Sequence, residues 1–211
     1  ILHIMIGMGS YGGAEQFALS YYENMDKSKI RFDFLFLNQN VLRFIDNQCL
    51  KESRIDELGI WKRKINLFTC IKTIKELIKY LKKSHYEIIH INSGIIKAEL
   101  CCLIAAKIAG VNVRIADSHT AKPISKGIRE SVSDKIKSTI VRNLATDYFA
   151  CSETAGIHLF GKKGIRSEKY RIVRNAIELD KYRYDAEKAE YVRQRERVEK
   201  GLIFGHVGRF V

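Results

Sequence analysis

The stretch ILHIMIGMGSYGGAEQFALSYYENM (residues 1–25) decides the fold class of this chain. Residues 1–6 are almost wholly apolar and run into glycines, as expected for a short parallel strand that is buried on both faces. After the glycine loop, residues 14–25 have the apolar spacing of a helix, and FDFLFL (residues 32–37) is a second apolar strand. Residues 1–37 therefore predict a β-α-β unit.

The same alternation of strand and helix continues to the end of the chain. Residues 41–58 are predicted to be helical in part, with a short strand near 60–65. Apolar runs predict further strands over 87–92, 111–117, 147–151, 170–177 and 202–211, and apolar spacing predicts helices over 67–81, 95–109, 127–144 and 185–200.

This order of elements predicts a Rossmann-like, doubly wound, mostly parallel α/β sheet with right-handed crossovers. Gly110 is expected to end one helix in the left-handed conformation, and Ser152 is expected to cap the helix that starts at Glu153. In such a sheet the ligand site lies beyond the carboxyl ends of the strands.

Positive charge dominates the composition. Thirty-seven Lys and Arg residues against 24 Asp and Glu residues give a formal net charge of +13, which attracts phosphates, anionic lipids and nucleic acids alike. The aromatic residues lie mostly in apolar alternations, so a nucleic-acid partner is not expected. No run of eighteen uncharged apolar residues occurs, and no export signal is visible, so a cytoplasmic protein is predicted.

The five cysteines have no paired spacing of the kind that binds metals. Cys101 and Cys102 are adjacent in an apolar stretch, and the other three are scattered. We therefore expect reduced, mostly buried thiols, no metal site and no cofactor.

The glycine loop has two interpretations. GMGSYG (residues 7–12) satisfies the dinucleotide pattern, but the second strand ends at Asn38 rather than at the acidic residue that would bind a ribose, so an NAD(P)-dependent oxidoreductase is only the alternative. In the longer stretch GSYGGAEQ (residues 9–16), Gly12 and Gly13 let bare backbone approach an anion at a helix amino terminus. A tight strand-to-helix turn with no ligand is the structural alternative for the loop, and a non-catalytic binding module is the third possibility for the whole chain.

GSYGGAEQ closely resembles the glycine-rich first loop of family 4 glycosyltransferases, which have the GT-B fold. Further stretches resemble successive motifs of that family in the same order: HINSG (90–94), ADSHT (116–120), FACSE (149–153), VRNAIELDKY (173–182) and GHVGRF (205–210). By this resemblance, residues 1–180 are the acceptor-side domain. Residues 181–211 are then a linker and the first strand of a nucleotide-sugar-binding domain, which is cut off near its start.

The resemblance also assigns donor residues. Gly12 and Gly13 are expected to contact the diphosphate of the donor across the cleft between the two domains. Arg209 corresponds to the arginine that grips the donor phosphates together with a lysine further along the chain.

The resemblance also makes His119 the catalytic residue, close to the donor sugar and able to hydrogen-bond it or the acceptor. Asn92 and Ser93 are expected to line the acceptor side. Ser152 and Asn175 are expected to be structural, as a helix cap and as a turn residue.

The function that follows is metal-independent, configuration-retaining transfer of a sugar from a nucleotide sugar to a glycan or lipid-linked acceptor, in cell-surface polysaccharide synthesis. The sequence lacks the Asp-x-Asp pair that metal-dependent GT-A transferases use. The basic helices near residues 72–83 and 126–142 are expected to rest on the anionic inner face of the plasma membrane. The fragment by itself is not expected to turn over at a normal rate.

Overall fold

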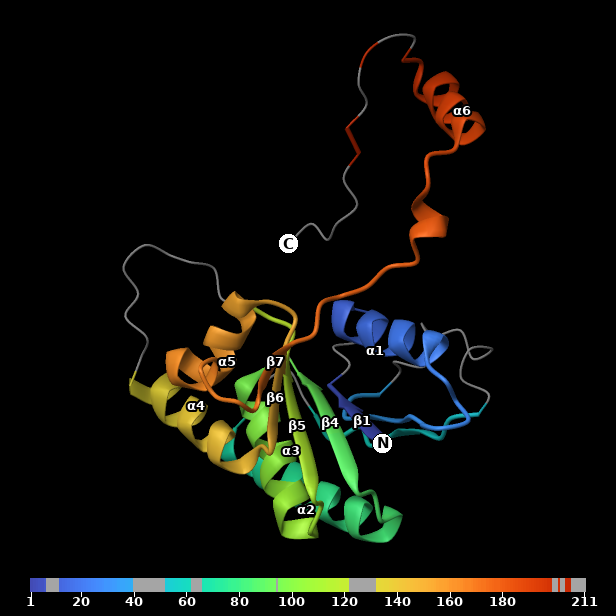
Figure 1. Cartoon of the computed structure of the whole chain (residues 1–211). Coiled ribbons are helices and arrows are strands. Elements are labelled where there is room, and N and C mark those ends of the chain that lie inside the picture. The colour runs from blue at the N-terminus through green and yellow to red at the C-terminus, as the bar shows by residue number, and fades with distance from the viewer. Residues whose placement is uncertain are drawn as a thin grey trace. The chain divides into compact units, whose positions relative to one another are not determined.

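The described part of the chain contains seven strands, which form a single sheet: β1 (Leu2–Met5), β2 (Asp33–Phe36), β3 (Ile55–Glu57), β4 (Ile88–Ser93), β5 (Val113–Ser118), β6 (Asp147–Ala150) and β7 (Tyr170–Ile172). Their order across the sheet is β3-β2-β1-β4-β5-β6-β7, and each neighbouring pair is parallel (Figure 1). The computed structural model describes residues 1–6, 12–39, 52–61, 66–93, 95–121, 132–198, 201 and 204–205. The predicted Rossmann-like α/β fold is confirmed.

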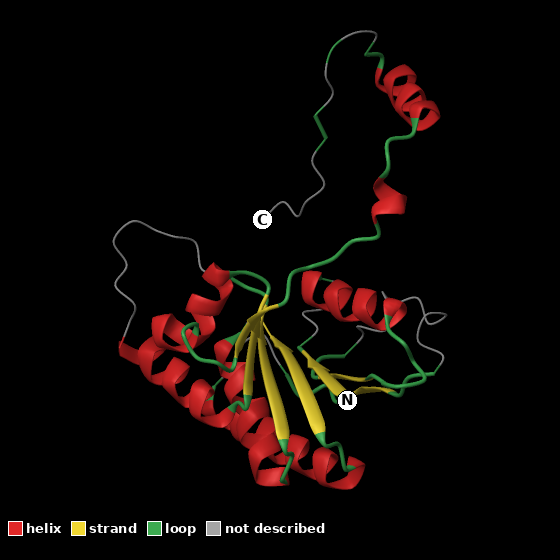
Figure 2. Ribbon diagram, in the orientation of Figure 1, coloured by secondary structure: helices red, strands yellow, loops and turns green. Residues whose placement is uncertain are grey.

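Helices cover the two faces of the sheet unequally. One face carries α1 (Gly13–Asn24), and the other carries α2 (Leu67–Ser84), α3 (Ile96–Ala109), α4 (Val132–Leu144) and α5 (Glu153–Gly164) (Figure 2). The α2–α5 side holds the larger apolar core, to which each of these four helices contributes buried side chains. The two sides are those of a doubly wound sheet, because the α1 crossover passes over one face and the crossovers after the strand order changes direction pass over the other.

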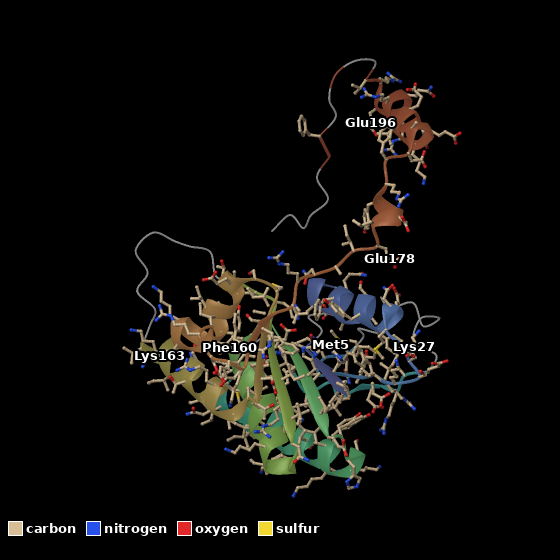
Figure 3. The ribbon with its side chains drawn as sticks, viewed as in Figure 1. Met5, Lys27, Phe160, Lys163, Glu178 and Glu196 are labelled. Atoms are coloured by element: carbon tan, nitrogen blue, oxygen red, sulfur yellow. The ribbon has the colours of Figure 1, made fainter. Side chains whose placement is uncertain are left out.

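The period of two along each strand sorts side chains between these faces. In β1, Leu2 and Ile4 join the larger core, whereas Met5 packs with α1 on the other side. Met5 and Phe160 mark the two cores in Figure 3. His3 alternates with Leu2 and Ile4 and therefore lies on the α1 side, where its ring packs against Phe34.

The predicted helix caps are confirmed. Gly110 ends α3 with φ 84°, a left-handed conformation that other residues rarely adopt. The Ser152 side chain accepts a hydrogen bond from the Ala155 amide at the start of α5. Both signals are local, which is why the sequence alone predicts them.

The third strand was placed wrongly. It spans Ile55–Glu57, inside the region predicted to be partly helical, and residues 60 and 61 form no strand. The triplet IDE contains two acidic residues and has little strand propensity of its own, so its pairing with β2 decides its conformation. The predicted elements at 41–51 and 62–65 lie outside the described residues. The strand predicted over 170–177 is shorter in the structure, where β7 ends at Ile172.

The chain divides into two compact units, residues 1–176 and 177–211. The sheet belongs to the first unit. The second contains a 3₁₀ turn, η2 (Leu179–Tyr182), and the helix α6 (Ala186–Glu196), whose Asp185 cap accepts a hydrogen bond from the Lys188 amide. None of the residues of α6 is buried. The strand predicted over 202–211 falls almost wholly outside the described residues.

Candidate functional site

The order of the strands creates a switch point between β1 and β4. The chain leaves β1 over α1 to reach β2 on one side, and it returns over α2 to reach β4 on the other side. A crevice at the carboxyl ends of the two strands is where ligands bind to open α/β sheets. Met5 is paired in register with Asn92 at this edge.

A buried polar cluster lies on the α1 side of the sheet at this point. Asp117 of β5 is completely buried, and its Oδ2 lies 3.0 Å from His90 Nε2 and 3.4 Å from His119 Nε2. Burial alone would raise the pKa of the Asp117 carboxyl, but hydrogen bonds and charge from His119 and His90 outweigh it and lower the pKa to about 2. Asp117 is therefore an ionised carboxylate held between two imidazoles.

Asn92 connects this carboxylate group to β1. Its Nδ2 donates to the His90 carbonyl oxygen at 3.2 Å and lies 3.0 Å from His3 Nδ1, and its Oδ1 lies 3.2 Å from His119 Nε2. Burial, followed by the neighbouring positive charge of His90, lowers the pKa of His3 well below its usual range. His3 is therefore neutral, and its Nε2 has no hydrogen-bond partner among the described residues.

His119 follows directly after β5 and is the last member of the cluster. Its ring centroid lies 4.8 Å from that of Phe17 on α1, and only 7% of its side chain is exposed. Its Nδ1 is buried, and within the described ranges it has no hydrogen-bond partner. A buried imidazole nitrogen with no protein partner is a group that a ligand can satisfy.

The two glycines at the amino terminus of α1 have different surroundings. The Gly12 amide donates to Glu15 Oε2 at 3.0 Å, and a Cβ added at Gly12 would lie 2.9 Å from that oxygen. A Cβ added at Gly13 would meet no atom of the described residues within 4 Å. The Gly12 amide is therefore already hydrogen-bonded to Glu15, whereas Gly13 faces open space. Contact with a diphosphate stays a prediction for both residues.

The remaining predicted site residues are Asn92, Ser93 and Arg209. Asn92 and Ser93 are 2% and 3% exposed, and the Ser93 hydroxyl both donates to the Ile95 carbonyl and accepts from the Ile95 amide. Both side chains are thus engaged inside the protein, and contact with an acceptor stays a prediction. Arg209 lies outside the described residues.

Sequence reasoning missed His3, His90 and Glu99. The first two had a detectable signal, because each is a histidine flanked by apolar residues within a buried strand, and the register pairs them directly. Glu99, in the first turn of α3, had none. It is completely buried, and burial followed by the nearby Asp117 charge raises its pKa well above the usual range.

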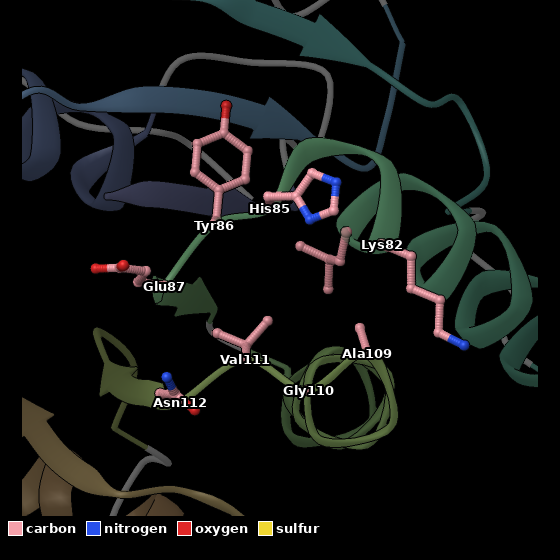
Figure 4. Close-up of a pocket in the computed structure, with 9 residues that line it drawn as sticks. Lys82, His85, Tyr86, Glu87, Ala109, Gly110, Val111 and Asn112 are labelled. Atoms are coloured by element: carbon pink, nitrogen blue, oxygen red, sulfur yellow. The ribbon is translucent and has the colours of Figure 1, made fainter.

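A surface pocket lies at the opposite edge of the sheet, where α2 and α3 end (Figure 4). Its lining includes His85, Tyr86 and Glu87, which precede β4, and Val111 and Asn112, which precede β5. It therefore lies at the amino ends of the strands, away from the polar cluster. It is not the predicted ligand site.

Within the described residues, no group of three His, Cys, Asp or Glu side chains could hold a metal ion. Cys70, Cys101, Cys102 and Cys151 are free thiols, and two of these four are buried. No helix in the same residues is long and apolar enough to cross a membrane.

Comparison with known proteins gives the following likenesses. No protein-family model matches the chain. The chain is 29% identical over 225 residues to "Putative glycosyltransferase EpsF" of Bacillus subtilis (strain 168), a match that covers 100% of the chain and 54% of that protein. The crystal structure of Anabaena Alr3699/HepE in complex with UDP matches with a TM-score of 0.65 and 17% identity, over 93% of this chain and 50% of that one. The crystal structure of a glycosyltransferase from Rickettsia africae ESF-5 matches with a TM-score of 0.63 and 14% identity, over 95% and 50% of the two chains.

The chain thus spans about half the length of the proteins that it matches. At this level of identity the two solved structures show the fold alone, which is a Rossmann-like α/β fold of the GT-B type. The similarity to EpsF favours sugar transfer over the NAD(P)-dependent alternative.

Proposed function

We propose that this chain is the acceptor-side half of a family 4 glycosyltransferase, whose second half binds the nucleotide sugar. The complete protein moves a sugar from a nucleotide-diphosphate sugar to a glycan or lipid-linked acceptor, in cell-surface polysaccharide synthesis. One observation carries this proposal: His119 lies at the carboxyl edge of the sheet, in a cluster that contains an ionised Asp117, and its buried Nδ1 has no hydrogen-bond partner in the part of the chain that the structure describes. The similarity to EpsF and the UDP complex of Anabaena HepE support a nucleotide-sugar donor.

The chemistry requires three tasks: stabilising the departing diphosphate, placing the acceptor hydroxyl and supporting positive charge on the sugar. The open backbone at Gly13, at the positive end of the α1 dipole, suits the first task. By the family resemblance, we also propose that Arg209 binds the donor phosphates. Amide and guanidinium donors replace a metal ion in this scheme, and we propose retention of the anomeric configuration on the same grounds of family resemblance.

The acceptor reaches this site from a membrane surface in our proposal. Val132, Ile136 and Ile140 recur every four residues along α4 and are 73%, 55% and 40% exposed. Leu67 and Phe68, at the start of α2, are 77% and 75% exposed. A helix that follows a parallel strand begins at the carboxyl edge of the sheet, so both apolar surfaces start at the edge that carries His119. Exposed apolar side chains on basic helices suit an anionic lipid surface.

The test of sugar transfer uses the full-length protein. Purified protein is incubated with a panel of nucleotide sugars and membrane-extracted acceptors, and sugar incorporation and released nucleoside diphosphate are measured. We expect one donor to support transfer without added metal and in the presence of a chelator, and His119→Ala to reduce its rate by about 10²-fold or more. Reduction of a substrate by NAD(P)H without release of nucleoside diphosphate would contradict the proposal.

The membrane contact is tested by sedimentation with liposomes of phosphatidylglycerol and phosphatidylcholine at low salt. Ile136→Glu is expected to reduce binding severalfold. Ile108→Glu is the matched control, because Ile108 is equally exposed, at 56%, but lies in the last turn of α3 at the opposite edge. Equal binding to liposomes with and without the anionic lipid would contradict this part of the proposal.

A further inference from the structure

The hydrogen bonds around Asn92 determine which way its amide points. The His90 carbonyl oxygen can only accept, so the group that lies 3.2 Å from it must be the amide nitrogen. The second hydrogen of that nitrogen points to His3 Nδ1 at 3.0 Å, which must then carry a lone pair. The Asn92 oxygen is left facing His119.

This orientation in turn determines the tautomer of His119. Its Nε2 lies 3.2 Å from Asn92 Oδ1 and 3.4 Å from Asp117 Oδ2, and neither oxygen can donate. The proton of a neutral His119 ring must therefore be on Nε2, because a lone pair there would face two acceptors. The lone pair is then on Nδ1, the buried nitrogen that has no partner among the described residues.

We propose that Asn92 and Asp117 are positioning residues, which hold His119 as the Nε2-protonated tautomer so that Nδ1 accepts a hydrogen bond from a substrate hydroxyl. His90 supports this arrangement, because its Nε2–H donates to Asp117 Oδ2 at 3.0 Å and fixes the carboxylate. This inference rests on the proposed function and extends it. It replaces the acceptor contact predicted for Asn92 with a role that acts through His119.

The ionisable groups around His119 belong to several elements. Asp117 precedes it on β5, His90 and His3 face it from β4 and β1, and Glu99 of α3 lies close to Asp117. Helix α1 presents the apolar Phe17 ring. Since His3 and Glu99 are neutral when folded, Asp117 carries the negative charge of this cluster.

The tautomer is measured directly by nuclear magnetic resonance of the full-length protein labelled with ¹⁵N-histidine. Long-range ¹H–¹⁵N correlations distinguish a protonated from an unprotonated ring nitrogen, and His119→Gln assigns the resonance. We expect a protonated Nε2 and an unprotonated Nδ1 at neutral pH. A protonated Nδ1 would overturn the positioning role.

The source of the hydroxyl is read from the same spectra. The donor identified by the transfer screen is added, and its nucleoside diphosphate is added separately. A shift of the His119 Nδ1 resonance with the sugar nucleotide but not with the diphosphate assigns the hydroxyl to the donated sugar. A shift that requires the acceptor extract assigns it to the acceptor, and no shift with any of the three would overturn the inference.

The pH dependence of transfer provides a second readout, which a merely structural role would not change. Asp117→Asn is expected to move the acidic limb of the rate profile to lower pH, because it removes the negative charge that lies 3.4 Å from His119 Nε2. Asn92→Asp is expected to move the limb upward. Asn112→Asp is the matched control, because Asn112 is exposed at the opposite edge of the sheet.

The two proposals can fail separately. Absence of transfer from every nucleotide sugar would overturn the proposed function, even with His119 protonated on Nε2. An active enzyme whose acidic limb is the same in Asp117→Asn as in the wild type would overturn only the positioning role. If Asn92→Asp does not fold, the wild-type spectrum and Asp117→Asn still decide the question.

Discussion

The two faces of the sheet are built from the same strands and have opposite characters. The α2–α5 face holds the larger apolar core, from Leu2 and Ile4 in β1 to Phe160 in α5, and Glu99 of α3 is the buried carboxyl among its described residues. The α1 face has a small apolar core beside a cluster of buried histidine, asparagine and aspartate side chains. Because side chains alternate along β1 and β4, one face of the sheet carries the larger apolar core and the other carries the polar candidate site.

The largest effect is expected from Phe160→Ala on the apolar face. Phe160 is completely buried and stacks on Tyr148 with ring centroids 5.0 Å apart. Its loss should lower the free energy of unfolding by about 3–5 kcal/mol through the cavity that it leaves. Urea unfolding of the chain, followed by the fluorescence of its single tryptophan, Trp61, measures this. Phe68→Ala is the control because Phe68 is 75% exposed, and an equal loss in both variants would contradict the comparison.

Glu99→Gln should stabilise the chain at neutral pH. Burial raises the pKa of Glu99 well above its unfolded value, so folding must take up a proton there, and stability is lost as pH rises through the unfolded pKa. The loss approaches about 1.4 kcal/mol per pH unit until the folded pKa is reached, and glutamine avoids it. Unfolding free energies of the two proteins should therefore converge below pH 4 and diverge above pH 5. Glu76→Gln, on the exposed side of α2, should show no such divergence.

His3 should produce the opposite pH dependence on the polar face. Its folded pKa is depressed by burial, so the unfolded chain binds the extra proton below about pH 6.5, and stability falls as pH decreases. His3→Gln keeps an acceptor for Asn92 but cannot titrate, and it should reduce the slope between pH 7 and pH 5. Urea midpoints at several pH values measure the slope, and an unchanged slope would show that His3 is not buried in neutral form.

The smallest effect on stability is expected at the start of α1. A Cβ at Gly13 meets nothing within 4 Å, so Gly13→Ala should raise stability by about 0.5–1 kcal/mol through reduced freedom of the unfolded chain. Gly12→Ala places its Cβ 2.9 Å from Glu15 Oε2 and should destabilise the helix start. Thermal unfolding of both variants measures this difference: the midpoint temperature should rise for Gly13→Ala and fall for Gly12→Ala. Weaker nucleoside diphosphate binding by a stable Gly13→Ala protein would support the predicted donor contact.

The strands of the sheet were predictable where local signals agree. The apolar runs that became β1, β2 and β4, the spacing that became α2 and α3, and the caps at Gly110 and Ser152 all depend on neighbours within a few residues. β3 was not predictable, because its three residues are held by pairing with β2 rather than by their own preference. Of the site, His119 and its edge were predicted through family resemblance. Its hydrogen bond to Asn92 was not, because Asn92 was predicted as an acceptor residue. His3 was missed, since it is far from Asn92 in the sequence and meets it only across the β1–β4 pair.

The sequence by itself determined a parallel, doubly wound sheet, because strand burial, helix spacing and glycine turns are properties of short segments. It also determined the excess of positive charge and the order of the motifs. The tertiary structure alone decided which polar side chains share a face, which carboxyl is ionised and which is protonated. The reason is physical: burial and charge depend on groups brought together from β1, β4, β5 and α3, and only the strand register sets those distances.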